Sequence, residues 1–155
     1  RRQRQMCIRD SPIGAVLMRP HIAHAIAAGD HGTTFGGGPL TCRIAHHVLG
    51  RLGEPRMKEH IDSVSTYLFE RLERISEAFS DMVSAPRGRG LIVGISMRSA
   101  PWAGEVVRLA RERGVLFLTA GSDAVRFVPS LIVERAHIDE AMDVLESVLL
   151  VLRST

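Results

Sequence analysis

The stretch from Pro55 to Phe79 carries the clearest pattern of apolar and polar positions in the chain. Its apolar residues recur at intervals of three and four, which is typical of a helix that buries one face. The pattern therefore predicts a long helix packed on a hydrophobic core. The apolar stripe comprises Ile61, Val64, Leu68, Leu72, Ile75 and Phe79. The charged side chains expected to face water are Glu70, Arg71, Glu73 and Arg74.

The residues after this helix show strand and helix patterns in turn. Apolar side chains at every second position predict a strand over residues 91–97, directly after a glycine–arginine turn at residues 87–90. Helices that lie between or after strands are expected to cover one face of a small mixed sheet. The remaining expected elements are a helix at 103–113, strands at 115–118 and 125–128 that form a hairpin, and a closing helix with apolar residues from 138 to 152.

The first part of the chain has shorter patterns. The apolar run from Ile13 to Met18 predicts a buried strand, and a brief helix is expected from Pro20 until Gly29 stops it. A second helix is expected from Pro39 to Leu52, where apolar residues fall at intervals of four. These elements do not belong obviously to the unit that follows, and they indicate the end of another domain.

Residues 29–40 combine several glycines with two adjacent threonines and lead into the helix that opens at Pro39. Glycine lets a ligand approach the main chain closely, and proline is well placed at the first position of a helix. The N–H groups of such a junction can bind a phosphate or a carboxylate, and Thr33 and Thr34 would add hydroxyl groups. A plain surface loop that leads into a helix remains the alternative.

The composition excludes several classes of protein. An apolar content of 45% and a charged content of 24% describe a globular protein of 155 residues, either one domain or a piece of a larger one. We expect no membrane span, since no apolar run approaches about 18 residues. The net charge of +3 lies entirely in the first ten residues, so nucleic-acid binding is not expected. Cys7 and Cys42 form no disulfide framework, and the histidines lack metal-ligand spacing, so no metal site is expected.

Several motifs occur in a fixed order along the chain. They are Pro-Ile-Gly-Ala at 12–15, the glycine-rich stretch at 29–40, Arg-Gly-Arg-Gly-Leu at 87–91, Leu-Thr-Ala-Gly at 118–121 and Val-Arg-Phe-Val-Pro at 125–129. Together they resemble the C-terminal third of the class III pyridoxal-phosphate aminotransferases, and in particular the acetylornithine branch of that family. The resemblance runs from about residue 12 to residue 150.

The resemblance implies an α/β fold, the C-terminal part of the type I pyridoxal-phosphate transferase fold. In this interpretation residues 12–54 end the large cofactor-binding domain, and residues 55–155 form a connecting helix and the small α+β C-terminal domain. Residues 1–11 do not match the family and are interpreted as an unrelated or artefactual segment. The resemblance implies a homodimer whose active sites are shared across the interface, and a cytoplasmic location is expected for this chain.

The resemblance also assigns roles to three side chains. Thr34 matches a threonine that contacts the cofactor phosphate of the neighbouring subunit, and Thr33 matches a position that contacts the acetylated substrate. Alone, Thr34 would be interpreted as a loop hydroxyl bonded to its own turn. Arg126, expected in mid-strand on the face opposite Val125 and Phe127, matches an arginine that binds a substrate carboxylate. Without the resemblance, Arg126 would be an ordinary exposed strand arginine.

The catalytic lysine of the family, which forms the Schiff base, has no counterpart at the matching position of this sequence. That position is Gln5, so no catalytic residue is assigned. The single lysine, Lys58, opens the long helix and is expected to lie in solvent. Because transamination requires such a lysine, the chain alone is expected to be inactive. The family also has an asparagine where this sequence has Gly38.

The activity that the resemblance implies is transfer of an amino group from N-acetylornithine to 2-oxoglutarate, with pyridoxal phosphate as cofactor, in arginine biosynthesis. Thr33 and Arg126 do not separate this substrate from ornithine, succinylornithine or a 4-aminobutyrate-type amine. The alternative from another class is a noncatalytic domain that binds an anion or mediates oligomerisation.

Overall fold

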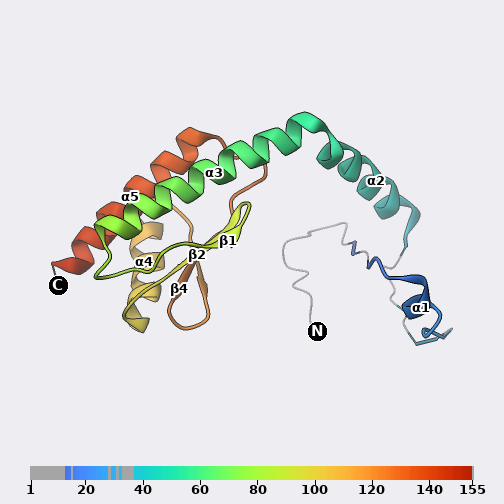
Figure 1. Cartoon of the computed structure of the whole chain (residues 1–155), viewed down its shortest axis with the longest axis horizontal. Helices are drawn as coiled ribbons and strands as arrows, with labels where there is room; N and C mark the ends of the chain where they lie inside the picture. The colour runs from blue at the N-terminus through green and yellow to red at the C-terminus, as the bar shows by residue number, and fades with distance from the viewer. Residues whose placement is uncertain (1–12, 15, 28, 31, 33–36, 155) are drawn as a thin grey trace. The chain divides into compact units, whose positions relative to one another are not determined.

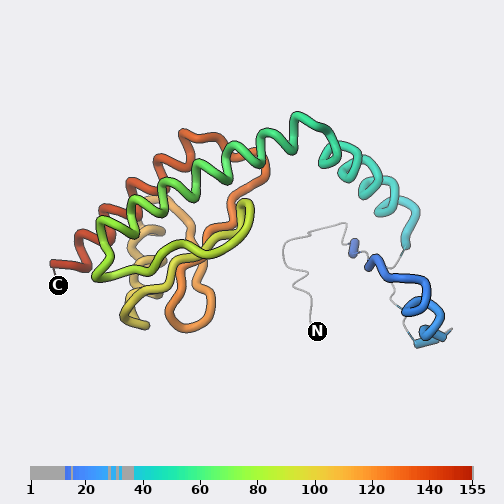
Figure 2. The backbone as a smooth tube through the Cα atoms, viewed as in Figure 1, coloured from blue at the N-terminus to red at the C-terminus, as the bar shows by residue number. Residues whose placement is uncertain are grey.

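The computed structural model describes residues 13–14, 16–27, 29–30, 32 and 37–154. The chain divides into two compact units, Arg1–Glu54 and Pro55–Thr155. In the figures the colour runs from blue in the first unit to red at the end of the second (Figures 1 and 2).

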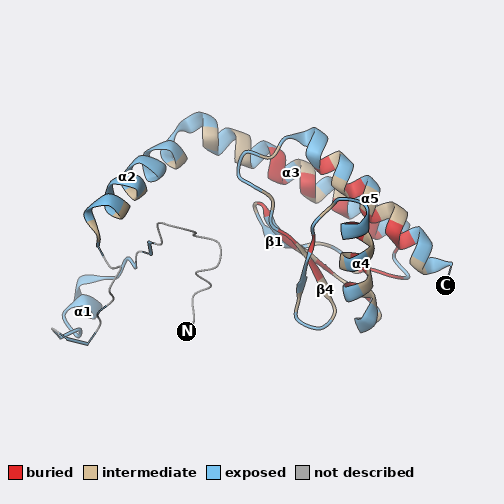
Figure 3. Ribbon diagram, turned by 180° about the vertical axis from the view of Figure 1, so that it is seen from behind, coloured by how far each residue is buried: buried red, intermediate tan, exposed pale blue. Residues whose placement is uncertain are grey.

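The first unit contains two helices. Helix α2 spans Pro39–Gly53, in agreement with the expected boundaries, and its first residue is the predicted proline. Helix α1, Pro20–Ala23, has four residues and ends well before the expected stop at Gly29. Within the described part of this unit no residue of either helix is buried, as the blue ribbon of Figure 3 shows.

The prediction of a strand from Ile13 to Met18 was wrong for the described residues of this stretch. Residues 13–14 and 16–18 form no strand and are exposed, and the Leu17 side chain is 100% exposed. A strand needs a hydrogen-bonded neighbour, and the described part of this unit offers none. A short apolar run alone therefore did not suffice to predict a strand.

The second unit is built from three helices and a four-stranded sheet (Figure 1). The strand order is β1-β2-β4-β3, and each neighbouring pair is antiparallel, so the expectation of a mixed sheet was wrong. Strand β4 lies between β2 and β3, which keeps these two from pairing directly. The elements are α3 (Pro55–Ala78), β1 (Arg87–Arg89), β2 (Ile92–Ser96), α4 (Ala100–Glu112), β3 (Leu118–Ala120), β4 (Ala124–Phe127) and α5 (Arg135–Arg153).

Two details of this sheet differ from the expectation. Residues 87–90 were expected to form a turn, but residues 87–89 form strand β1, and the turn follows at Gly90, which has a φ of 59°. The strand expected at 115–118 lies later, at Leu118–Ala120. Its hairpin with β4 is confirmed, and residues 121–123 connect the two strands.

The core of the second unit lies between the sheet and its helices. Helix α4 contacts β3 and β4 and packs on α5, which in turn packs on α3. The predicted stripe of α3 is confirmed, since four of its apolar side chains are buried, namely Val64, Leu68, Leu72 and Ile75. Alternation along β2 and β4 points Val93 and Val125 into the core and places Gly94 and Arg126 on the opposite face of the sheet. We call this opposite face the open face.

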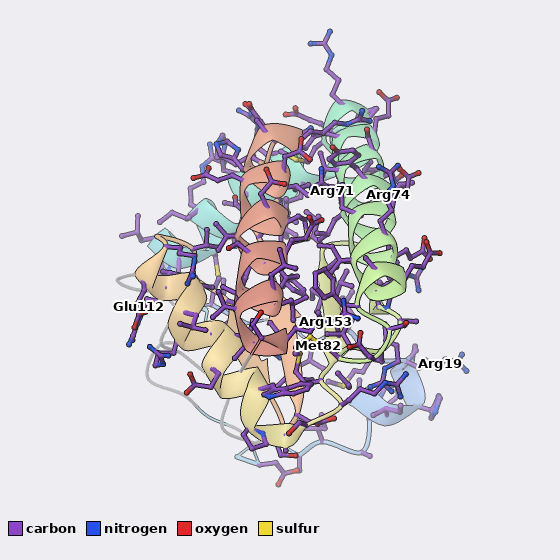
Figure 4. The ribbon with its side chains drawn as sticks, turned by 90° about the vertical axis from the view of Figure 1, so that its left-hand side faces the viewer. Arg19, Arg71, Arg74, Met82, Glu112 and Arg153 are labelled. Atoms are coloured by element: carbon purple, nitrogen blue, oxygen red, sulfur yellow. The ribbon has the colours of Figure 1, made fainter. Side chains whose placement is uncertain are left out.

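Helices α3 and α5 are also joined by a polar cluster, which we call the α3–α5 clamp. Arg71 donates from Nη1 to Oδ1 of Asp139 at 2.6 Å and from Nη2 to Oδ1 of Asp143 at 3.0 Å. Tyr67 donates from Oη to the same Asp139 oxygen at 2.6 Å. Figure 4 shows Arg71 between the two helices. Arg71 was expected to face water, but its side chain is only 19% exposed. Its partners lie 68 and 72 residues away in the sequence, so the pattern within α3 did not reveal them.

Candidate functional site

Arg126 lies in the middle of β4, on the open face of the sheet. Its neighbours in register are Gly94 of β2 and Leu118 of β3. The flanking residues, Val125 and Phe127, are buried on the other face. The predicted placement of Arg126, in mid-strand and opposite these two apolar residues, is therefore confirmed.

The guanidinium of Arg126 is partly buried, and its Nε atom is buried without a hydrogen-bond partner. Among the described side chains, the only other such nitrogen is Nε2 of His60. A buried donor left unpaired costs about 1–3 kcal/mol, so it calls for a physical explanation. A planar fork of donors suits a carboxylate, which can accept two parallel hydrogen bonds. The unpaired donor makes Arg126 a candidate anion-binding residue.

A cavity of about 140 Å³ adjoins Arg126 at the β3 side of the sheet. The end of β4 forms one wall, and the first half of α5 forms another, with Ile138 and Met142 among the lining residues. The lining is mostly apolar, and its polar members include Arg126 and His137. Aliphatic or aromatic groups would fit this cavity, because its surface is mostly apolar.

A second arginine lies on the open face, across the sheet from Arg126. Arg87 of β1 pairs in register with Gly94, which itself pairs with Arg126. Arg87 is exposed and donates from Nη2 to Oγ of Ser96 at 2.9 Å. In the register of the sheet, Gly94 thus lies between Arg87 and Arg126. In the described part of the chain, neither arginine forms an ion pair with a carboxylate.

The other predicted site residues come from the glycine-rich stretch at 29–40. Thr33 and Thr34 fall outside the described residues, so their assigned contacts stay predictions. Beside them, Gly37 has a φ of 71°, a conformation that favours glycine, and Gly38 directly precedes helix α2. The Oγ1 of Thr41 donates to the carbonyl oxygen of Gly38 at 2.8 Å.

Lys58 is exposed in the first turn of α3, as expected. Its ammonium group forms no hydrogen bond or ion pair with the described residues. This exposed position differs from the desolvated surroundings in which a nucleophilic lysine is normally found.

The described residues contain neither a metal-ligand cluster nor a helix suited to cross a membrane. No group of three or more His, Cys, Asp or Glu side chains lies close enough to hold a metal ion. No described helix combines the length and the apolar character needed to cross a bilayer.

Reasoning from the sequence did not identify Gly94 as part of this site. A glycine inside a strand often marks a close approach of a ligand or of another backbone, and this signal was available in the stretch 91–97. What the sequence could not show was the register that places Gly94 directly beside Arg126.

The profile of a family described as aminotransferase class-III matches residues 11–149. The mitochondrial acetylornithine aminotransferase of Neurospora crassa is 42% identical over 135 residues, which are 87% of this chain and 29% of that protein. The succinylornithine transaminase of Photorhabdus laumondii is 37% identical over 142 residues, 90% of this chain and 35% of that protein. Among solved structures, lysine aminotransferase from M. tuberculosis aligns with a TM-score of 0.73 and 32% identity, covering 80% of this chain and 28% of that one. The chain thus spans about three tenths of the length of the relatives it matches.

Proposed function

The chain belongs to the class-III aminotransferase family, and from this premise we propose that it is part of an enzyme that moves an amino group from N-acetylornithine to 2-oxoglutarate. Its fold is that of a fragment of the type I transferase fold, with a helix-covered antiparallel sheet. The name of the Neurospora relative supports the acetylated donor. We infer arginine biosynthesis as the setting because acetylornithine is the donor proposed.

Arg126 is the observation that carries the proposal. Its buried Nε has no acceptor within the described residues, and its partner in register on β2 is a glycine. Of the two substrates of the proposed reaction, 2-oxoglutarate carries a carboxylate next to its reacting keto carbon, whereas N-acetylornithine reacts at its terminal amino-bearing carbon, away from its carboxylate. Binding the carboxylate of 2-oxoglutarate through two parallel hydrogen bonds would fix the orientation of the keto carbon and satisfy the donor. We therefore propose that Arg126 binds the substrate carboxylate.

The proposed cofactor is pyridoxal phosphate, which supplies an electron sink for the bond-breaking steps at the amino-bearing carbon. A threonine hydroxyl among glycine backbone donors is a chemically suitable set for a phosphate dianion. We propose that Thr34 binds this phosphate in a homodimer, across the subunit interface, and that Thr33 contacts the acyl group of the donor. A covalent link would need a lysine, and the exposed Lys58 does not fit that role. The phosphate contact is therefore the part of cofactor binding that we assign to this chain.

A second donor is favoured by a specific comparison. The Photorhabdus relative is named for succinylornithine, which differs from acetylornithine in the acyl group. Arg126 would bind the carboxylate of 2-oxoglutarate, which both reactions share, so it does not decide between the two donors. We propose the acetylated donor as the first choice and the succinylated donor as the second. A cytoplasmic location stays a prediction, since the Neurospora relative is named mitochondrial.

Replacing Arg126 by lysine in the complete enzyme tests the proposal. Lysine keeps the charge but cannot form two parallel hydrogen bonds, so we expect the KM for 2-oxoglutarate to rise by about tenfold or more. The absorbance of the bound cofactor should stay the same, because Arg126 is not assigned to cofactor binding. An unchanged KM would remove Arg126 from the substrate site.

The isolated chain offers a separate test of the lysine assignment. Mixed with pyridoxal phosphate, it should give no visible absorbance band of a lysine-bound cofactor, and Lys58→Ala should give the same spectrum. A band that Lys58→Ala abolishes would show that this lysine does hold the cofactor. Protection from proteolysis by inorganic phosphate, without any band, would instead favour a noncatalytic anion-binding domain.

A further inference from the structure

We propose that Gly94 is a specificity-determining position of the substrate site, because its missing side chain keeps the space beside Arg126 open for a carboxylate. The inference rests on the proposed function, in which Arg126 binds a substrate carboxylate, and it adds a second residue to that site. It follows from the sheet register, from the backbone at Gly94 and from the side chains around it.

The register places Gly94 directly opposite Arg126 in an antiparallel pair. Directly opposed residues point to the same face of a sheet, with their Cβ positions about 4.5–5.5 Å apart. A side chain at position 94 would therefore stand next to the stem of Arg126 on the open face. No other residue of β2 is placed to fill this space so directly.

The backbone itself does not require glycine at position 94. Gly94 is absent from the positive-φ glycines of the described chain, so an L-residue can adopt its conformation. A Cβ added there would lie 3.3 Å from the carbonyl oxygen of Val125, so this oxygen would have to move by a few tenths of an ångström. Gly88 is different, because its added Cβ would overlap the main chain of Ile92 and Val93. The glycine at 94 is better explained by the space it leaves than by backbone strain.

The surroundings of this space fit a short carboxylic acid. Arg126 borders it on one side, and Leu118, the partner of Arg126 on β3, is 49% exposed next to that guanidinium. Arg87 borders it on the other side and is held by Ser96. The charge of this face is thus positive, with an aliphatic surface beside it. An α-keto or α-amino acid presents the matching combination of a carboxylate and a short carbon chain.

Titration of the full 155-residue chain with 2-oxoglutarate, followed by NMR of the arginine Nε–H groups, tests the inference. In the unsubstituted chain the resonance of Arg126 should shift and yield a Kd. Gly94→Ala should raise the Kd, and Gly94→Val should raise it further, by about tenfold, because a branched side chain denies the carboxylate one of its charged hydrogen bonds. Ala120→Val is the matched control. Ala120 lies on the same face of the sheet, two strands from Gly94, and it pairs with Ala124 rather than with Arg126, so the Kd of this variant should not change.

The outcomes separate this inference from the proposed function. If Gly94→Val keeps a dispersed spectrum and binds 2-oxoglutarate as tightly as the unsubstituted chain, the role of Gly94 is refuted and that of Arg126 stands. If Arg126→Lys leaves the Kd unchanged, or if Arg126 does not respond to 2-oxoglutarate, the carboxylate site itself is refuted. Should the valine variant fail to fold, the smaller Gly94→Ala change decides, and an unchanged Kd there counts against the proposal.

Discussion

The α3–α5 clamp allows a quantitative prediction about which ion pairs stabilise this unit. We expect Arg71 and Asp139 to be energetically coupled in a double-mutant cycle with Arg71→Met and Asp139→Asn. Methionine retains the packing of the arginine stem, and asparagine retains an acceptor for the hydroxyl of Tyr67. The cycle therefore isolates the interaction between the two charges.

The expected size follows from the exposure of the two side chains. Arg71 is 19% exposed and Asp139 is 38% exposed, so the pair is intermediate between a surface ion pair and a buried one. Surface pairs contribute about 0.2–1 kcal/mol, and buried charged hydrogen bonds contribute about 1.5–3 kcal/mol. We therefore expect a coupling of about 1 kcal/mol. The surroundings also act on the arginine: burial alone lowers the pKa of Arg71, but hydrogen bonding to Asp143 and Tyr67 and the charge of Asp139 raise it above its ordinary value.

Urea unfolding of the four proteins in the cycle, monitored by circular dichroism, measures the coupling from their free energies of unfolding. Arg108 and Glu112 of α4 provide the matched control. Their N–O distance is also 2.6 Å, but their side chains are 47% and 56% exposed. The corresponding cycle with Arg108→Met and Glu112→Gln should give a clearly smaller coupling. Equal coupling in the two cycles would refute the argument that burial, rather than distance, determines the contribution.

Two further changes test the packing of the same unit. Leu72→Ala should lower the free energy of unfolding by about 3 kcal/mol, because Leu72 is 0% exposed in the core, and a loss below 1 kcal/mol in urea unfolding would contradict the assigned core. Gly88→Ala should lower the free energy of unfolding by at least about 2 kcal/mol, since its Cβ would overlap the main chain of Ile92. Gly104→Ala, at an exposed position of α4, should leave the free energy of unfolding unchanged or raise it. Thermal unfolding compares these two alanine variants. Equal melting temperatures would contradict the expected overlap, because they would show that β1 relaxes around the new side chain at position 88.

Elements defined by side-chain periodicity could be predicted from the sequence. The stripe that includes Leu68 and Leu72, and the alternation of Val93 and Ile95, are each visible within one segment and are buried as expected. Periodicity reports which face of an element is apolar, and burial of that face is what stabilises the element. The long helix, the β2 strand and the last helix were predictable for this reason.

Features that depend on pairing between distant segments could not be predicted in this way. Residues 87–89 contain glycine and arginine only, and they form a strand because β2 lies beside them. Arg71 looked like a solvent-facing position until α5 brought Asp139 next to it. In the site, the sequence placed Arg126 on a strand, but the unpaired Nε and the neighbouring glycine depend on how three strands align.

The sheet of the second unit is bordered on both sides by strands of only three residues, β1 and β3. A border this short offers few free backbone donors and acceptors to an incoming chain, which limits growth of the sheet by strand addition. Self-association of this unit would therefore have to proceed through side chains. Such contacts can be changed by surface substitutions without altering the hydrogen-bond ladder.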